Sequence, residues 1–96
     1  MFVHHVFFWL KEDADKAYFH QEVSKLGSIS EVQSIHVGTA PPAERDVVDG
    51  SFDFSLLLTF ANKADHDAYQ VHADHDVFIQ NCSALWTRVQ VFDAVD

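Results

Sequence analysis

Apolar side chains dominate the first ten positions of the chain and fall on both faces of a predicted strand. Residues 2–10 are rich in valine and aromatic residues and end at the polar run that begins with Lys11, which is typical of a β-strand. Because side chains alternate along a strand, one face carries Val3, His5, Phe7 and Trp9, and the other carries Phe2, His4, Val6, Phe8 and Leu10. Both faces of this strand are therefore apolar.

The next segment predicts a helix over residues 14–26. Phe19, Val23 and Leu26 recur at the i, i+4, i+7 spacing of one helix face, and they follow a suitable N-cap residue, Asp13. The helix is thus expected to bury this face.

Two further strands are predicted on either side of a loop. Residues 29–37 hold spaced apolar residues, and residues 51–60 have an apolar residue at every second position, with Leu57 on the otherwise polar face. The pair Pro41-Pro42 excludes regular structure from the charged loop over residues 39–50. The predicted strand over residues 51–60 has one face made of Phe52, Phe54, Leu56, Leu58 and Phe60.

The last third of the chain predicts two helical segments and a closing strand. Asn62 is a good N-cap for a helix that runs to about Val71. A second helical segment is expected over residues 74–84, and residues 86–95 alternate as a strand.

This order of elements, β-α-β-β-α-β, is that of the α+β ferredoxin-like fold. In that fold two helices cover one face of a four-stranded antiparallel sheet, and 96 residues suffice for one such domain over residues 1–96. The other sheet face stays bare although it carries large apolar side chains, whose burial is worth about 25 cal/mol per Å². We therefore expect a homodimer joined through the sheet faces.

The charge balance narrows the range of partners. Fifteen Asp and Glu against six Lys and Arg give a formal net charge of −9, which repels nucleic-acid phosphates and anionic membranes. Neither nucleic acid nor membrane is therefore expected as a partner. The apolar run over residues 1–10 has no basic segment before it and is too short to span a bilayer. The lone Cys82 has no second cysteine in the chain with which to form a disulfide. These features favour a cytoplasmic protein.

Seven histidines make this chain unusually rich in imidazole, and they are the first candidates for chemistry. His5 lies inside an apolar strand, where its ring needs a polar partner. The other histidines outside the segment 69–75 are interpreted as structural or surface residues, namely His4, His20, His36 and His66.

A metal site is the competing interpretation of the histidines. Its candidate ligands are His66, His72, His75, Asp65, Asp67, Asp74 and Asp76. Their spacing matches no established zinc motif. We therefore expect neither a metal nor an organic cofactor.

The segment 69–75 offers a different pair of functional groups. Tyr69 and His75 are six residues apart, which is about 240° around a continuous helix. They meet only if the helix breaks near Ala73.

Several of these residues together resemble the stress-responsive dimeric α/β-barrel (Dabb) domain family over essentially the whole chain. The resemblance rests on His5, Val37-Gly38, Phe60, Tyr69-x-x-His72-x-x-His75 and Phe92-Asp93. It implies a ferredoxin-like dimer whose two sheets close into an α/β barrel. The sequence departs from the family pattern at Ala73, where the family usually has a proline that would break the helix.

Within this family the sequence resembles plant polyketide cyclases of the olivetolic acid cyclase type, which close a ring by an aldol-type reaction without a cofactor. That resemblance implies catalytic roles for His5, Tyr69, His75 and Asp93. A pocket for a small apolar or aromatic molecule is expected between sheet and helices, lined by Phe7, Trp9, Phe19, Val23, Leu56, His72 and Phe78. Two alternatives stay open: a non-catalytic stress-associated dimeric domain, and a cofactor-free monooxygenase-like dimeric barrel.

Overall fold

The computed structural model describes residues 1–96, and its elements follow the predicted order. The strands are β1 (Phe2–Leu10), β2 (Ser34–Gly38), β3 (Phe54–Phe60) and β4 (Trp86–Val95), and the helices are α1 (Lys16–Ser24), α2 (Lys63–Gln70) and α3 (Ala73–Cys82). Short 3₁₀ turns, Lys25–Ser28 and Ser83–Leu85, follow α1 and α3. None of the helices combines the length and the apolar character needed to cross a bilayer.

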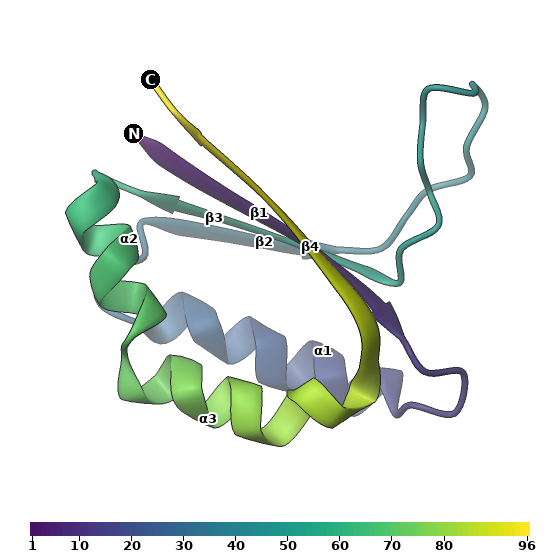
Figure 1. Cartoon of the computed structure of the whole chain (residues 1–96), viewed down its shortest axis with the longest axis horizontal. Coiled ribbons are helices and arrows are strands. Elements are labelled where there is room, and N and C mark those ends of the chain that lie inside the picture. Colours follow the sequence, from purple (N-terminus) through teal and green to yellow (C-terminus); the bar gives the residue numbers. More distant parts are fainter.

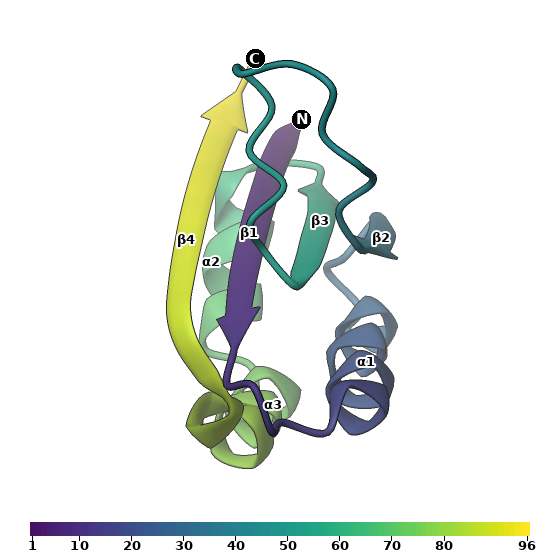
Figure 2. The ribbon, with the colours of Figure 1, turned by 90° about the vertical axis from the view of Figure 1, so that its right-hand side faces the viewer.

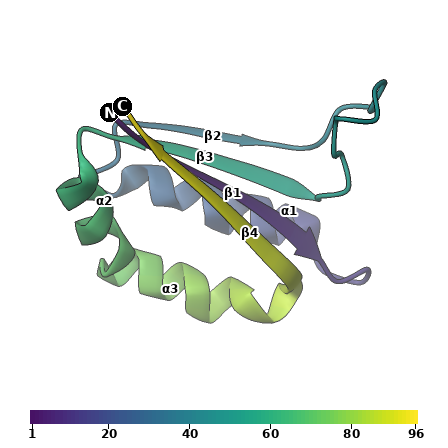
Figure 3. The ribbon, with the colours of Figure 1, turned by 45° about the horizontal axis from the view of Figure 1, so that its top comes forward.

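The four strands form one antiparallel sheet in the order β2-β3-β1-β4. All three helices lie on the same face of this sheet, and the opposite face carries no helix (Figures 1 and 2). The two termini lie side by side at one end (Figure 3), where the amino group of Met1 is 2.7 Å from the Asp96 carboxylate. The architecture is the predicted ferredoxin-like fold.

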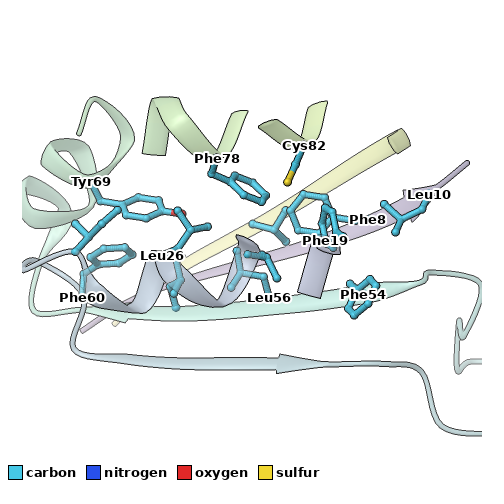
Figure 4. Packing of buried hydrophobic residues seen from close by; sticks show 14 of the residues in the cluster. Phe8, Leu10, Phe19, Leu26, Phe54, Leu56, Phe60, Tyr69, Phe78 and Cys82 are labelled. Atoms are coloured by element: carbon cyan, nitrogen blue, oxygen red, sulfur yellow. The ribbon is translucent and has the colours of Figure 1, made fainter. Parts of the chain in front are cut away.

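The core lies between the sheet and the helices. Burial alternates strictly along β1 and β3, and the even-numbered residues of both strands are the buried ones. Phe8 on β1 packs edge-on against Phe19 of α1, with ring centroids 5.0 Å apart, and Phe19 also contacts Phe78 of α3. Figure 4 shows how these rings join the strands to both helices. The helix-facing side of the sheet is thus the face that contains His4.

The second and third strands are shorter than the alternating pattern predicts. Ile29 is buried, but it belongs to a turn closed by a hydrogen bond from the Val32 amide to its carbonyl, so β2 begins only at Ser34. The Asp53 carboxylate accepts a hydrogen bond from the Leu10 amide at 2.7 Å. The Asp53 amide still donates to the Phe8 carbonyl at 2.8 Å, but the Leu10 amide is bound by a side chain and not by the backbone of a paired strand. The irregular loop therefore continues beyond residue 50 (Figure 1).

The first helix ends earlier than predicted because its last turn tightens into the 3₁₀ form. Gly27 lies in that turn, and a Cβ atom there would come within 2.8 Å of the Cγ2 atom of Ile35. The absence of a side chain therefore lets the end of the helix approach β2 closely.

Candidate active site

A cavity of about 340 Å³ lies between the sheet and the α2–α3 pair. Its polar side chains come from three elements: His4 from β1, Tyr69 and Gln70 from α2, and His75 from α3. Its apolar lining comes mainly from Val6, Phe8, Leu56, Phe78, Val89 and Val91. A mostly apolar hollow with a few convergent polar groups is the usual form of a small-molecule site.

A break between α2 and α3 brings Tyr69 and His75 together. The α2 helix ends at Gln70, and His72 then adopts an extended conformation (φ −67°, ψ 144°) before α3 begins at Ala73. The Nδ1 atom of His72 accepts the amide hydrogen of Asp74 at 3.0 Å, so its side chain caps α3. The predicted break therefore exists without the proline.

The two rings meet edge to face. Their centroids are 4.9 Å apart and their planes are inclined by 75°. Burial lowers the pKa of His75 below its usual value, which keeps the imidazole unprotonated, and so able to accept a proton, at neutral pH. Burial raises the pKa of Tyr69, so its hydroxyl stays protonated and acts as a hydrogen-bond donor. The pair thus combines a base with a neutral acid.

The imidazole of His75 has one unsatisfied atom. Its Nδ1 is shielded from solvent and has no hydrogen-bond partner within the protein. Since buried polar atoms are normally paired, this atom makes His75 an exception among the side chains that line the cavity.

His4 and Asp93 form the second polar unit of this site. Their strands pair them directly, and the Nδ1 atom of His4 is 2.6 Å from a carboxylate oxygen of Asp93. Because a carboxylate only accepts, this Nδ1 carries the hydrogen, and in the neutral ring Nε2 keeps its lone pair. Burial lowers the pKa of His4, and the Asp93 contact opposes this shift. The ring centroid of His4 lies 6.0 Å from that of Tyr69.

The strand histidine of the site is therefore His4 and not the predicted His5. The His5 side chain lies on the other face of the sheet, where its Nε2 is 2.8 Å from the Ser55 hydroxyl. Phe7 and Trp9 share that face with His5, so they do not line the cavity either. Side chains alternate between the two faces of a strand, so neighbouring residues such as His4 and His5 lie on opposite faces of the sheet.

The remaining predicted residues divide between cavity and core. Leu56 and Phe78 line the cavity as expected, whereas Phe19 and Val23 are fully buried within the core. His72 caps α3 and is not among the cavity residues. Sequence reasoning missed the other eight cavity residues, which are His4, Val6, Phe8, Gln70, Ile79, Trp86, Val89 and Val91. The signal that could have identified His4 as a site residue is its position opposite Asp93 in the sheet. That position is known only once the register between β1 and β4 is known.

A second hollow of about 210 Å³ lies on the helix-free face of the sheet. Phe7, Trp9, Phe52 and Phe92 form its apolar wall, and the Arg88 guanidinium lies 4.1 Å from the centre of the Trp9 ring. This hollow belongs to the face that was expected to join two copies of the chain.

Comparison with protein families gives one match, to the Stress Responsive A/B Barrel Domain (Dabb), over residues 2–96. The chain belongs to the Dabb family. Comparison with curated protein sequences gives no match.

Solved structures of low sequence identity share the fold of this Dabb domain. A Dabb family protein from Mesorhizobium loti is 22% identical with a TM-score of 0.82, over 99% of this chain and 95% of that one. A hydroxynitrile lyase from Passiflora edulis is 21% identical with a TM-score of 0.82, over 99% and 92% of the two chains. A dimeric ferredoxin-like protein of unknown function from Thermobifida fusca is 17% identical with a TM-score of 0.79, over 99% and 90%.

Proposed function

We propose that this Dabb domain is a cofactor-free lyase-type catalyst that closes or cleaves carbon–carbon bonds next to a carbonyl group. The observation that carries the proposal is the edge-to-face contact between the neutral His75 imidazole and the Tyr69 ring at a mostly apolar cavity. The substrate class is a small, uncharged molecule with an alkyl or aromatic part, because the cavity has apolar walls and no Lys or Arg.

The reaction that best fits these groups is an aldol-type ring closure of the polyketide cyclase kind. His75 takes a proton from a carbon between two carbonyl groups, and the electron pair left behind moves onto one carbonyl oxygen. The Tyr69 hydroxyl donates a hydrogen bond to that oxygen, where negative charge develops. The enolate carbon then bonds to a second carbonyl carbon of the same molecule while the π bond of that carbonyl breaks, and the resulting alkoxide oxygen takes the proton back from His75.

The His4–Asp93 pair has a supporting role in this proposal. Asp93 fixes the tautomer of His4, whose Nε2 then accepts hydrogen bonds at the wall of the cavity. A substrate hydroxyl is the matching group. The lyase from Passiflora edulis supports the general reaction class, since it has the same fold and its name describes the cleavage of a hydroxynitrile.

The functional unit in this proposal is a homodimer joined through the helix-free sheet face. That face presents Phe92, 62% exposed, together with the partly exposed Phe7 and Trp9. The protein from Thermobifida fusca is described as dimeric. Apolar side chains at these positions favour a second copy over a polar partner.

The test is turnover of a linear poly-β-ketone by purified protein. Tyr69→Phe and His75→Ala are each expected to lower the rate by about 100-fold or more while leaving the far-UV circular dichroism unchanged. Tyr18→Phe and His20→Ala make the same changes on α1, outside the cavity, and are expected to keep the wild-type rate. Equal rates for the cavity variants and wild type would refute the catalytic roles. Ligand binding without turnover by wild type would favour a non-catalytic domain.

A further inference from the structure

Two buried histidines from different elements converge beside the active-site cavity. His4 comes from β1 and His66 from α2, and their ring centroids are 4.9 Å apart. The His66 ring stacks on Phe2 at 4.2 Å and lies edge-on to Phe60 at 5.5 Å, so it is held among aromatic groups. The proposed reaction uses no group of His66, and its presence in this apolar layer needs another explanation.

The Nε2 atoms of both rings face one common neighbour. The amide nitrogen of Gln70 is 3.4 Å from Nε2 of His4 and also 3.4 Å from Nε2 of His66. Two imidazole lone pairs therefore point toward a single side-chain amide. Rotation of that amide by half a turn would put its oxygen where the nitrogen is now.

The other nitrogen of each ring is held by a carboxylate. Nδ1 of His4 is 2.6 Å from Asp93, and Nδ1 of His66 is 3.2 Å from Asp67. Metal-binding histidines have this arrangement, since an outer carboxylate orients the ring and makes the coordinating nitrogen more basic. One ligand atom each from His4, His66 and Asp93 also lies within 4.8 Å of the other two.

We infer that His4, His66 and Gln70 bind a divalent transition-metal ion of the zinc type, with Asp93 and Asp67 as outer partners. Ligands at about 2.0–2.1 Å from a tetrahedral ion lie about 3.3 Å from one another. The 3.4 Å separations between Gln70 and the two Nε2 atoms match that spacing once the amide has turned. Two imidazoles with an oxygen ligand suit Zn²⁺, Co²⁺ or Ni²⁺ rather than Mg²⁺ or Ca²⁺.

This site leaves one position open toward the cavity, because both His4 and Gln70 line it. A bound ion would therefore be reached by a small ligand, as in metal sites that keep a fourth position for water or substrate. The inference shares one atom with the proposed function, because a metal ion on Nε2 of His4 would take the place of the substrate hydroxyl that is proposed to bind there. It uses neither His75 nor Tyr69, and it is tested by metal binding alone.

The experiment is a calorimetric titration of tag-free, metal-stripped protein with Zn²⁺, and a parallel titration with Co²⁺ followed by visible absorption. Wild type is expected to bind one ion per chain and to give the intense absorption bands of tetrahedral Co²⁺. His66→Leu keeps an apolar side chain between the aromatic rings and is expected to weaken binding at least 100-fold. His20→Leu, the same change on the exposed surface of α1, is the matched control and is expected to bind as wild type.

Gln70→Glu provides a second variant that does not alter the aromatic layer. Its carboxylate replaces the amide between the two rings, and it is expected to bind Zn²⁺ at least tenfold more tightly than wild type. Equal affinity of wild type and His66→Leu would overturn the inference. The inference would also be overturned if wild type bound no stoichiometric Zn²⁺ at millimolar concentration, or if Gln70→Glu left the affinity unchanged.

Discussion

The break between α2 and α3 can be tested by supplying the proline that this chain lacks. Ala73 is the first residue of α3 and is exposed, and the preceding His72 has the extended conformation that a following proline requires. Proline is favoured at the first position of a helix, where the missing N–H has no intrahelical partner. The substitution Ala73→Pro should therefore fit the native backbone.

The expected effect of Ala73→Pro is stabilisation through the unfolded chain. A proline at a compatible site raises the free energy of unfolding by about 0.4–1 kcal/mol. For a domain of this size that corresponds to a rise in Tm of about 2–8 °C. Ala68→Pro is the matched control, because Ala68 is also exposed but lies inside α2. There proline should cost about 3 kcal/mol, since it removes a helical donor and clashes with the preceding turn.

The assay is urea unfolding followed by far-UV circular dichroism, with every variant at the same protein concentration because dimerisation contributes to stability. The geometry of His72 predicts that Ala73→Pro raises the free energy of unfolding, whereas Ala68→Pro lowers it. A loss of stability in Ala73→Pro, or equal losses in both variants, would refute the view that the backbone is already set for a proline at this position.

Three further predictions concern the core, the open face and pH. Leu58→Ala should lower the free energy of unfolding by about 2–5 kcal/mol, because Leu58 is fully buried. Val47→Ala, at an 81% exposed position, should change the free energy of unfolding by less than about 0.5 kcal/mol. Similar losses of stability in the two variants would contradict the assigned core. Phe7→Asp on the helix-free face should convert a dimer into a monomer in sedimentation velocity, and an unchanged mass would remove that face as the interface. Burial lowers the pKa of His4 and His75 in the folded state from the usual 6.5, so the unfolded chain binds more protons below that pH. The stability that the neutral rings contribute is present above pH 6.5 and is lost as the pH falls through the lowered pKa values of the folded state. Urea unfolding at pH 7.5 and at pH 5.5 measures this loss. Greater stability at pH 5.5 than at pH 7.5 would contradict the prediction.

Periodicity predicted most of the fold because local alternation reflects which side chains are buried. The pattern over residues 51–60 placed Leu56 and Leu58 on one apolar face, and the structure buries both residues on the helix-facing side of β3. Boundaries were less accurate where a side chain replaced a backbone partner. The hydrogen bond from the Leu10 amide to Asp53 delays the start of β3, and no local pattern predicts a bond across 43 positions.

The candidate site was only partly predictable for the same reason. The spacing of Tyr69 and His75 showed that a helix break was needed, and the break is present. The choice between His4 and His5 depended on which face of β1 meets the helices, because both faces of that strand are apolar. A sequence with apolar residues on both sides of a strand contains no local information on its orientation.

The sequence by itself determined the order of the elements and the family, and it showed that Tyr69 and His75 would meet if the helix broke between them, because each of these depends on spacings within one or two neighbouring segments. Only the tertiary structure decided that Asp93 meets His4 and that His66 meets both His4 and Gln70. These contacts join the two ends of the chain to α2 through strand register and helix packing. Such long-range pairings are set by the whole fold, so no local pattern along the chain specifies them.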